Sequence, residues 1–152
     1  SGSGTSAYFT IPFIPVNLKF ESDNQSLYKN SYAWSNKTIL VADDIDANFV
    51  YLKAALKNTN ANVLWAKNGV EAVDFVKQGS SINLILMDLV MPEMDGVEAT
   101  KLIKNINRQI PIIGQTAYPN QELRGDSGFD SILEKPIKVN RMLMELDKYL
   151  SN

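Results

Sequence analysis

The stretch Thr38-Ile-Leu-Val-Ala-Asp-Asp44 predicts how this chain folds, because an apolar run ends abruptly in two acids. A short, continuous apolar run is typical of a strand that is buried on both faces of a sheet. The pattern returns further along the chain, which indicates that several such strands pack together. The later strands are predicted at 62–66, 84–87, 110–114 and 131–133.

Apolar residues recur between these runs at the spacing of an amphipathic helix. Strands that alternate with such helices predict an α/β fold, in which helices cover both faces of a doubly wound, five-stranded parallel sheet of order 2-1-3-4-5. Four apolar helix faces are predicted: Phe49, Leu52, Ala55 and Leu56; Val70, Val73 and Val76; Ala99, Leu102, Ile103 and Ile106; and Val139, Met142, Leu143, Leu146 and Leu150. A short helix is also predicted around 119–124.

The residues before Lys37 differ in character from the rest. Residues 1–6 are small and polar, as in an expression tag, and Ala7-Tyr-Phe-Thr-Ile-Pro12 predicts one short strand. A lone strand is not stable by itself, so this one belongs to a domain outside this sequence or pairs with a neighbouring sheet edge. The predicted division is 1–12 as the end of another domain or a tag plus strand, 13–36 as a linker, and 37–152 as the folded domain.

The composition excludes several classes of chemistry. Among the 152 residues there is no cysteine and no histidine. These absences exclude disulfides, zinc–thiolate sites, cysteine nucleophiles and the Ser-His-Asp triad. A net charge of −2 without a basic block argues against a nucleic-acid partner. No apolar run approaches the roughly 18–20 residues that cross a bilayer, so this chain is not expected to contact a membrane directly.

Polar residues stand where the predicted strands end. Asp43 and Asp44 follow the first strand, Asp88 the third, Thr116 the fourth and Lys135 the fifth. In a parallel sheet all carboxyl ends lie at one edge, where doubly wound folds bind their ligands. With the order 2-1-3-4-5 the first and third strands are neighbours, so we expect the three carboxylates to converge.

Three converging carboxylates call for a cation. A like-charged pair about 4 Å apart costs about 4 kcal/mol at an effective dielectric constant of about 20. Mg²⁺ removes this conflict, and it usually binds one or two carboxylates together with water and phosphate oxygens. Aspartate can accept a phosphoryl group, a transfer that depends mainly on positioning and charge neutralisation. The pattern therefore predicts a Mg²⁺-dependent phosphoryl acceptor, with Thr116 and Lys135 as donors to the phosphoryl oxygens.

Each of these residues also has a simpler explanation by itself. Either aspartate after the first strand could cap the following helix, and the one after the third strand could belong to a turn. Thr116 could be an ordinary strand-end residue and Lys135 a solvated surface lysine. Their common position at one edge of an apolar sheet favours a site. For residues 91–96, by contrast, we predict only a turn with Asp95 as helix cap.

A set of motifs then points to a known family. The motifs are Ile39-Leu-Val-Ala-Asp-Asp44 with Asp46 and Asn48, Asn68-Gly-Val-Glu-Ala72, Leu86-Met-Asp-Leu-Val-Met-Pro-Glu-Met-Asp-Gly96, Thr116-Ala117 and Lys135-Pro136. With them, residues 37–151 resemble the receiver domain of two-component response regulators, especially receivers in hybrid histidine kinases. The resemblance implies that Asp88 is the phosphoacceptor, Thr116 the switch hydroxyl and Lys135 the lysine that pairs with the phosphoryl group.

The same resemblance implies a set of metal ligands. Asp44 would bind Mg²⁺ directly and Asp43 largely through water. Asp88 and the backbone carbonyl of Val90 would supply the remaining protein ligands. The family's Lys–Pro peptide is commonly cis, which makes Lys135–Pro136 a candidate cis bond.

The first residues carry a second, shorter resemblance. Gly2-Ser-Gly-Thr-Ser-Ala-Tyr-Phe-Thr-Ile-Pro12 is similar to the end of a histidine-kinase ATP-binding domain, although a Gly-Ser vector scar could mimic its first four residues. The kinase interpretation implies a hybrid sensor kinase. The present chain would then be cytoplasmic, and its parent protein would be a candidate for membrane anchoring. The phosphoryl donor would be a histidine-kinase dimerisation domain or a histidine phosphotransferase, which explains why the chain needs no histidine of its own.

Some positions depart from the family pattern. The place three residues before the lysine, often aromatic in receivers, holds Ile132, and a polar Gln115 stands where a small or apolar residue is usual. Val90 and Tyr118 lie two residues beyond Asp88 and Thr116, where receivers admit or exclude the attacking water. Because both are bulky and not acidic, we expect this phosphoacceptor to show only weak, slow self-dephosphorylation.

Two other functions remain open from the sequence. The first is a receiver fold kept only for protein docking, without phosphorylation. The second is a phosphatase with an aspartate nucleophile; such enzymes, however, carry Asp-x-Asp after the first strand, whereas the nucleophile here would end the third strand.

Overall fold

The computed structural model describes residues 32–119 and 127–151. Outside these residues lie the predicted strand at 7–12 and most of the predicted linker. The resemblance of residues 1–12 to a kinase domain or a tag also concerns residues outside this range. Most of the short helix expected around 119–124 lies outside it as well. Within the described residues, no helix is long and apolar enough to span a membrane.

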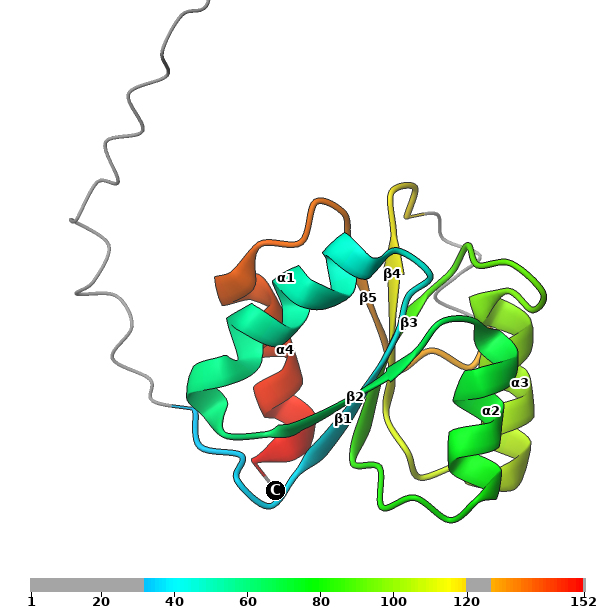
Figure 1. The fold of residues 1–152 in the computed structure, drawn as a ribbon, viewed down its shortest axis with the longest axis horizontal. Helices are drawn as coiled ribbons and strands as arrows, with labels where there is room; N and C mark the ends of the chain where they lie inside the picture. The colour runs from blue at the N-terminus through cyan, green and yellow to red at the C-terminus, as the bar shows by residue number, and fades with distance from the viewer. Residues whose placement is uncertain (1–31, 120–126, 152) are drawn as a thin grey trace, which may run out of the picture. The chain divides into compact units, whose positions relative to one another are not determined.

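Five parallel strands form one sheet in the order β2-β1-β3-β4-β5, as predicted (Figure 1). Their carboxyl ends all lie at the upper edge in that view. The α/β fold class is therefore confirmed. The strands are β1 (Thr38–Ala42), β2 (Asn62–Ala66), β3 (Leu84–Asp88), β4 (Ile112–Thr116) and β5 (Ser131–Glu134).

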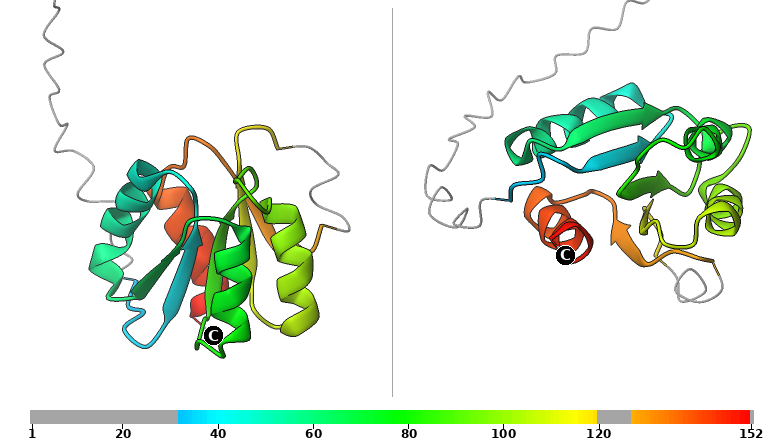
Figure 2. Two further views of the ribbon diagram at one scale, coloured as in Figure 1. Left: turned by 45° about the vertical axis from the view of Figure 1, so that its right-hand side comes forward. Right: turned by 90° about the horizontal axis from the view of Figure 1, so that it is seen from below.

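Helices cover both faces of the sheet. α1 and α4 lie on one face, and α2 and α3 pack side by side on the other, an arrangement that two further views repeat (Figures 1 and 2). The helices are α1 (Asp46–Leu56), followed by the short 3₁₀ turn η2 (Lys57–Thr59), then α2 (Gly69–Lys77), α3 (Gly96–Ile106) and α4 (Val139–Leu150).

The fourth strand lies two residues later than predicted. It was expected at 110–114, but β4 pairs with its neighbours from Ile112, opposite Ile85, to Thr116, opposite Glu134. Pro111 has no N–H to donate to a neighbouring strand, so regular pairing begins after it. The shift extends β4 to Thr116, which makes this threonine the last residue of β4 that pairs with β5.

The buried face of α3 also differs from the prediction. Ala99 and Ile103 are buried, as expected, but Leu102 and Ile106 are 38% and 46% exposed. Gly96 and Thr100 are buried instead. Small residues at these positions let α3 lie close to the sheet, and this turns its two larger apolar side chains outward.

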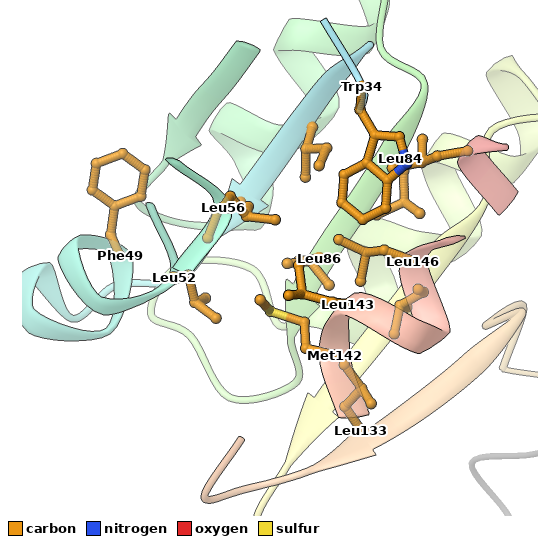
Figure 3. Packing of buried hydrophobic residues seen from close by; sticks show 14 residues of the cluster. Trp34, Phe49, Leu52, Leu56, Leu84, Leu86, Leu133, Met142, Leu143 and Leu146 are labelled. Atoms are coloured by element: carbon orange, nitrogen blue, oxygen red, sulfur yellow. The ribbon is translucent and has the colours of Figure 1, made fainter. Parts of the chain in front are cut away.

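A hydrophobic core fills each side of the sheet, and the core beneath α1 and α4 includes Trp34 (Figure 3). Trp34 precedes β1, yet it is only 2% exposed, and its backbone N–H donates to Thr59 at 2.6 Å. Tyr32 packs against the same cluster, with its ring 5.3 Å from that of Trp34. Residues ahead of the first strand thus contribute to the core of this domain.

Candidate functional site

Three carboxylates meet at the carboxyl ends of β1 and β3. Asp43, Asp44 and Asp88 each offer an oxygen, and these oxygens all lie within 4.8 Å of one another. The strands are neighbours in the sheet, which is why acids 44 residues apart in sequence come together. Asp43 and Asp88 are buried, whereas Asp44 is exposed at the mouth of the cluster.

Lys135, from the loop after β5, reaches across to two of these acids. Its Nζ lies 2.8 Å from Oδ2 of Asp88 and 3.4 Å from Oδ2 of Asp43. The Lys135 backbone N–H donates to the carbonyl of Thr116 at 2.8 Å, which ties this loop to the end of β4. The peptide between Lys135 and Pro136 is cis, as the family resemblance implied.

Asp43 is held in place by its local surroundings. Its Oδ1 accepts from the backbone N–H of Ile45 at 2.9 Å, and the side-chain amide of Asn48 donates to both carboxylate oxygens at 3.0 and 3.1 Å. The indole N–H of Trp65 donates to the Asp43 carbonyl at 2.9 Å. The helix-cap alternative does not hold, because Ile45 occupies the N-cap of α1 without any side-chain cap.

Asn48 is a site residue whose role the sequence analysis did not identify. It stands in the first turn of α1, five residues after Asp43, and the helix turns its amide back towards the carboxylate. The signal available in the sequence was the place of Asn48 in the motif after Asp44, which does not by itself reveal its partner.

Burial raises the pKa of the Asp88 carboxyl above its ordinary value. The ammonium of Lys135 opposes this rise through its hydrogen bond and its charge, while the neighbouring charge of Asp43 reinforces it. Ionisation of Asp88 therefore costs folding free energy. A bound cation would lower this cost, and so would a group transferred to Asp88 together with a cation.

Thr116 ends β4 at the same edge of the sheet. Asp88 pairs in register with Gln115, so Thr116 lies one residue beyond the acid on the adjacent strand. It is 7% exposed, and its hydroxyl oxygen accepts from the backbone N–H of Tyr118 at 3.1 Å. Its own O–H has no acceptor among the residues that the structure describes, and so it is able to donate to a ligand at this edge of the sheet.

The loop after β3 lies directly against Asp88. The N–H of Val90 points at Oδ1 of Asp88 across 3.4 Å, while the Val90 side chain is 78% exposed. Asp95 caps α3 by accepting from the N–H of Glu98 at 2.8 Å, as predicted. At Gly96, a Cβ atom would stand only 2.1 Å from the Asp88 carbonyl, so this loop can close only with glycine there.

The donor set fits a hard divalent cation. Three carboxylates meet a single lysine, so the cluster keeps a net negative charge, and the exposed Asp44 opens it to solvent. Oxygen ligands on one open side are what Mg²⁺ prefers, since it retains several waters and takes few protein ligands. The residues present therefore suit Mg²⁺.

Comparisons with known proteins agree with this geometry. Residues 39–147 match the family model of the response regulator receiver domain. The chain is 34% identical, over 148 residues, to the autoinducer 2 sensor kinase/phosphatase LuxQ of Vibrio parahaemolyticus. That match covers 93% of this chain but only 17% of LuxQ, so the chain corresponds to a small part of that protein.

Two solved structures share the fold. One is the receiver domain of the sensor histidine kinase PA1611 from Pseudomonas aeruginosa, with magnesium in its active-site cleft; it is 28% identical with a TM-score of 0.70, over 76% of this chain and 98% of that one. The other is a co-crystal of the Saccharomyces cerevisiae phosphotransfer protein Ypd1 with the receiver domain of Ssk1. It gives 25% identity and a TM-score of 0.70, over 76% of this chain and 89% of that chain.

Proposed function

Since the chain belongs to the response regulator receiver domain family, we propose that Asp88 is its phosphoacceptor and takes a phosphoryl group from a phosphohistidine. The observation that carries this assignment is the contact of 2.8 Å between Lys135 Nζ and Asp88 Oδ2, inside a cluster of three carboxylates. A nucleophile needs a cation beside it where charge develops, and here the cation reaches Asp88 from the loop after β5, across the intervening strand β4.

In the proposed step, one Asp88 carboxylate oxygen attacks the phosphorus of the donor. An O–P bond forms, the histidine N–P bond breaks, and the imidazole leaves with the electron pair of that bond. Lys135 then pairs with a phosphoryl oxygen in place of Asp88 Oδ2, and the Thr116 hydroxyl donates to another. Asp43 stays fixed by Asn48 throughout.

Mg²⁺ would be held by Asp44, Asp88 and the Val90 carbonyl, with Asp43 acting largely through water. When bound, it supplies the positive charge that neutralises the acids and the phosphoryl oxygens during transfer. Support comes from the clustered carboxylates here and from the magnesium ion in the PA1611 receiver domain.

The wider protein is proposed to be a hybrid histidine kinase, with 1–12 as the end of its ATP-binding domain, 13–36 as linker and 37–152 as the receiver. The end of this linker packs on the receiver, because Tyr32 and Trp34 join its core. The match to LuxQ, a sensor kinase, extends over 93% of this chain and so beyond the receiver itself. Its phosphoryl donor would be a kinase dimerisation domain or a histidine phosphotransfer protein, the class to which Ypd1 belongs. A cytoplasmic location stays a prediction.

Beryllofluoride with Mg²⁺ tests the assignment, because it mimics a phosphoryl group on an aspartate. We expect it to shift the NMR signals of Thr116 and Lys135 in the wild type and in the control Asp74→Asn, which alters an exposed acid on α2. Asp88→Asn should show no such shift. Unchanged spectra in the wild type would contradict the proposal.

Mg²⁺ titration and phosphoester turnover separate the alternatives. A domain kept only for docking would show no Mg²⁺ binding that Asp44→Ala removes. A phosphatase would turn over a generic phosphoester steadily, and Asp88→Asn would abolish that turnover.

A further inference from the structure

A pocket of about 380 Å³ opens beside the acid cluster, between α1 and the loop that follows β5. Its walls are largely apolar, with Leu52 and Tyr51 from α1 facing Pro136 and Ile137. Tyr51 fixes the two walls together, since its hydroxyl donates to the Ile137 carbonyl at 2.9 Å. The volume is far more than one water molecule requires, so a side chain of another molecule can enter.

Gln115, from β4, contributes to the lining of this pocket and is fully buried. Neither Oε1 nor Nε2 of its amide has a hydrogen-bond partner among the residues that the structure describes. An unpaired buried polar group is destabilising, and here both halves of one amide are unpaired. None of the described residues supplies a partner that would explain a glutamine at this place, whereas a ligand with matching polar atoms would.

The pocket adjoins the reaction centre. Two of its lining residues, Asn48 and Lys135, also hold Asp43 and Asp88. Beside its mouth, α1 presents Val50 with 63% and Tyr51 with 48% of their surface exposed. A donor must bring its phosphorus within bonding distance of Asp88, so its surface has to lie over this part of α1 and over the pocket.

We propose that the pocket is a carboxamide subsite, which receives an asparagine or glutamine side chain of the protein that delivers the phosphoryl group to Asp88. This inference rests on the proposed function. A carboxamide carries a donor and an acceptor in one plane, so it pairs with both atoms of the Gln115 amide once that amide turns from its fully buried position into the pocket. A carboxylate would leave Oε1 facing another acceptor, and an ammonium would lie near Lys135 and leave Nε2 unpaired.

Gln115→Leu is the decisive variant, because it fills the same space without polar atoms. Since it removes two unpaired buried groups, we expect it to fold and to unfold at a higher temperature than the wild type. The matched control is Gln109→Leu, the same change at an exposed position before β4.

Benzamide probes the subsite directly by NMR titration of the isotope-labelled chain, with benzoate as the charged comparison. We expect saturable benzamide shifts at the Gln115 side-chain amide and at Ile137, in the wild type and Gln109→Leu. Affinity should fall at least roughly tenfold in Gln115→Leu, equivalent to about 1.4 kcal/mol. Absence of binding, equal binding to Gln115→Leu, or tighter binding of benzoate would overturn the proposal.

Phosphoryl transfer then tests the occupant. From a panel of purified phosphohistidine proteins that includes Ypd1, the donor with the fastest transfer to the wild type is used for kinetics. Gln115→Leu should raise the KM for this donor at least roughly fivefold with little change in kcat, because the subsite acts in docking. An unchanged KM would overturn the assignment to the donor protein.

Labelling of Asp88 by acetyl phosphate, which needs no docking, should be equal in all three proteins. If acetyl phosphate labels none of them, it is the proposed function that fails, whatever benzamide shows.

Discussion

Lys135 contacts Asp88 at 2.8 Å although 47 residues separate them in the sequence. The pair joins the loop after β5 to the end of β3 across the intervening strand β4. Because Lys135 also lies 3.4 Å from Asp43, one ammonium offsets two buried carboxylates. The arrangement of charge at the site therefore depends on this side chain.

Replacing Lys135 with alanine should destabilise the metal-free domain, since it leaves Asp88 and Asp43 without their cation. Removing one partner of a fully buried ion pair costs about 3–5 kcal/mol. The lysine side chain is 25% exposed, so we expect a smaller loss, of about 1–2 kcal/mol. Urea denaturation in EDTA measures it, with the exposed Lys138→Ala as control. Equal losses in the two variants would contradict this account.

The stability of the metal-free domain should depend on the ionisation of Asp88. Its pKa is raised in the folded state above the ordinary 3.8, so the folded chain binds this proton more tightly than the unfolded chain does. By linkage, its contribution to the unfolding free energy falls as pH rises through the interval between 3.8 and the raised value.

Asp88→Asn removes this dependence, so at pH values above the interval it should unfold at a higher temperature than the wild type in EDTA. Added Mg²⁺ should raise the unfolding temperature of the wild type more than that of Asp88→Asn. Thermal scans between acidic and neutral pH test both points. A variant that is less stable than the wild type at neutral pH in EDTA would be inconsistent with a costly ionised Asp88.

Trp34 should be needed for the stability of the domain, although it precedes the first strand. Its side chain is 2% exposed within the core beneath α1 and α4. Truncating a buried tryptophan to alanine costs about 3–5 kcal/mol. We expect Trp34→Ala to lose a stability of this order in urea denaturation, and the exposed Ala33→Ser to lose little. A loss below about 1 kcal/mol would show that residues ahead of β1 do not belong to the folding unit.

The phosphorylated state should be long-lived. Val90 and Tyr118, which are 78% and 86% exposed, flank the mouth of the site as bulky side chains without an acid that could orient water. We expect the phosphorylated chain to have a half-life well above seconds. The loss of ³²P after labelling measures this half-life. Tyr118→Glu should shorten it roughly tenfold, a change of about 1.4 kcal/mol in the barrier. Decay within seconds in the wild type would refute this prediction.

Local pattern accounts for much of what could be predicted. The strand and helix order followed from short apolar runs and helical spacing, and the carboxyl-end positions of Asp43, Asp88 and Lys135 followed from that order. The start of β4 was wrong by two residues, because Pro111 interrupts pairing while remaining apolar. The predicted buried face of α3 was wrong at Leu102 and Ile106, which are exposed. How closely a helix approaches a sheet depends on small residues such as Gly96, and spacing alone does not show this.

The sequence by itself determined the parallel sheet and the edge at which its acids gather, because apolar periodicity and strand ends are local properties of the chain. Only the tertiary structure decided that Asn48 orients Asp43, that Trp34 joins the core, and that the amide of Gln115 is buried without a partner. Each of these depends on which side chain lies opposite another across the packed layers. That information arises only when segments far apart in the sequence share one interior.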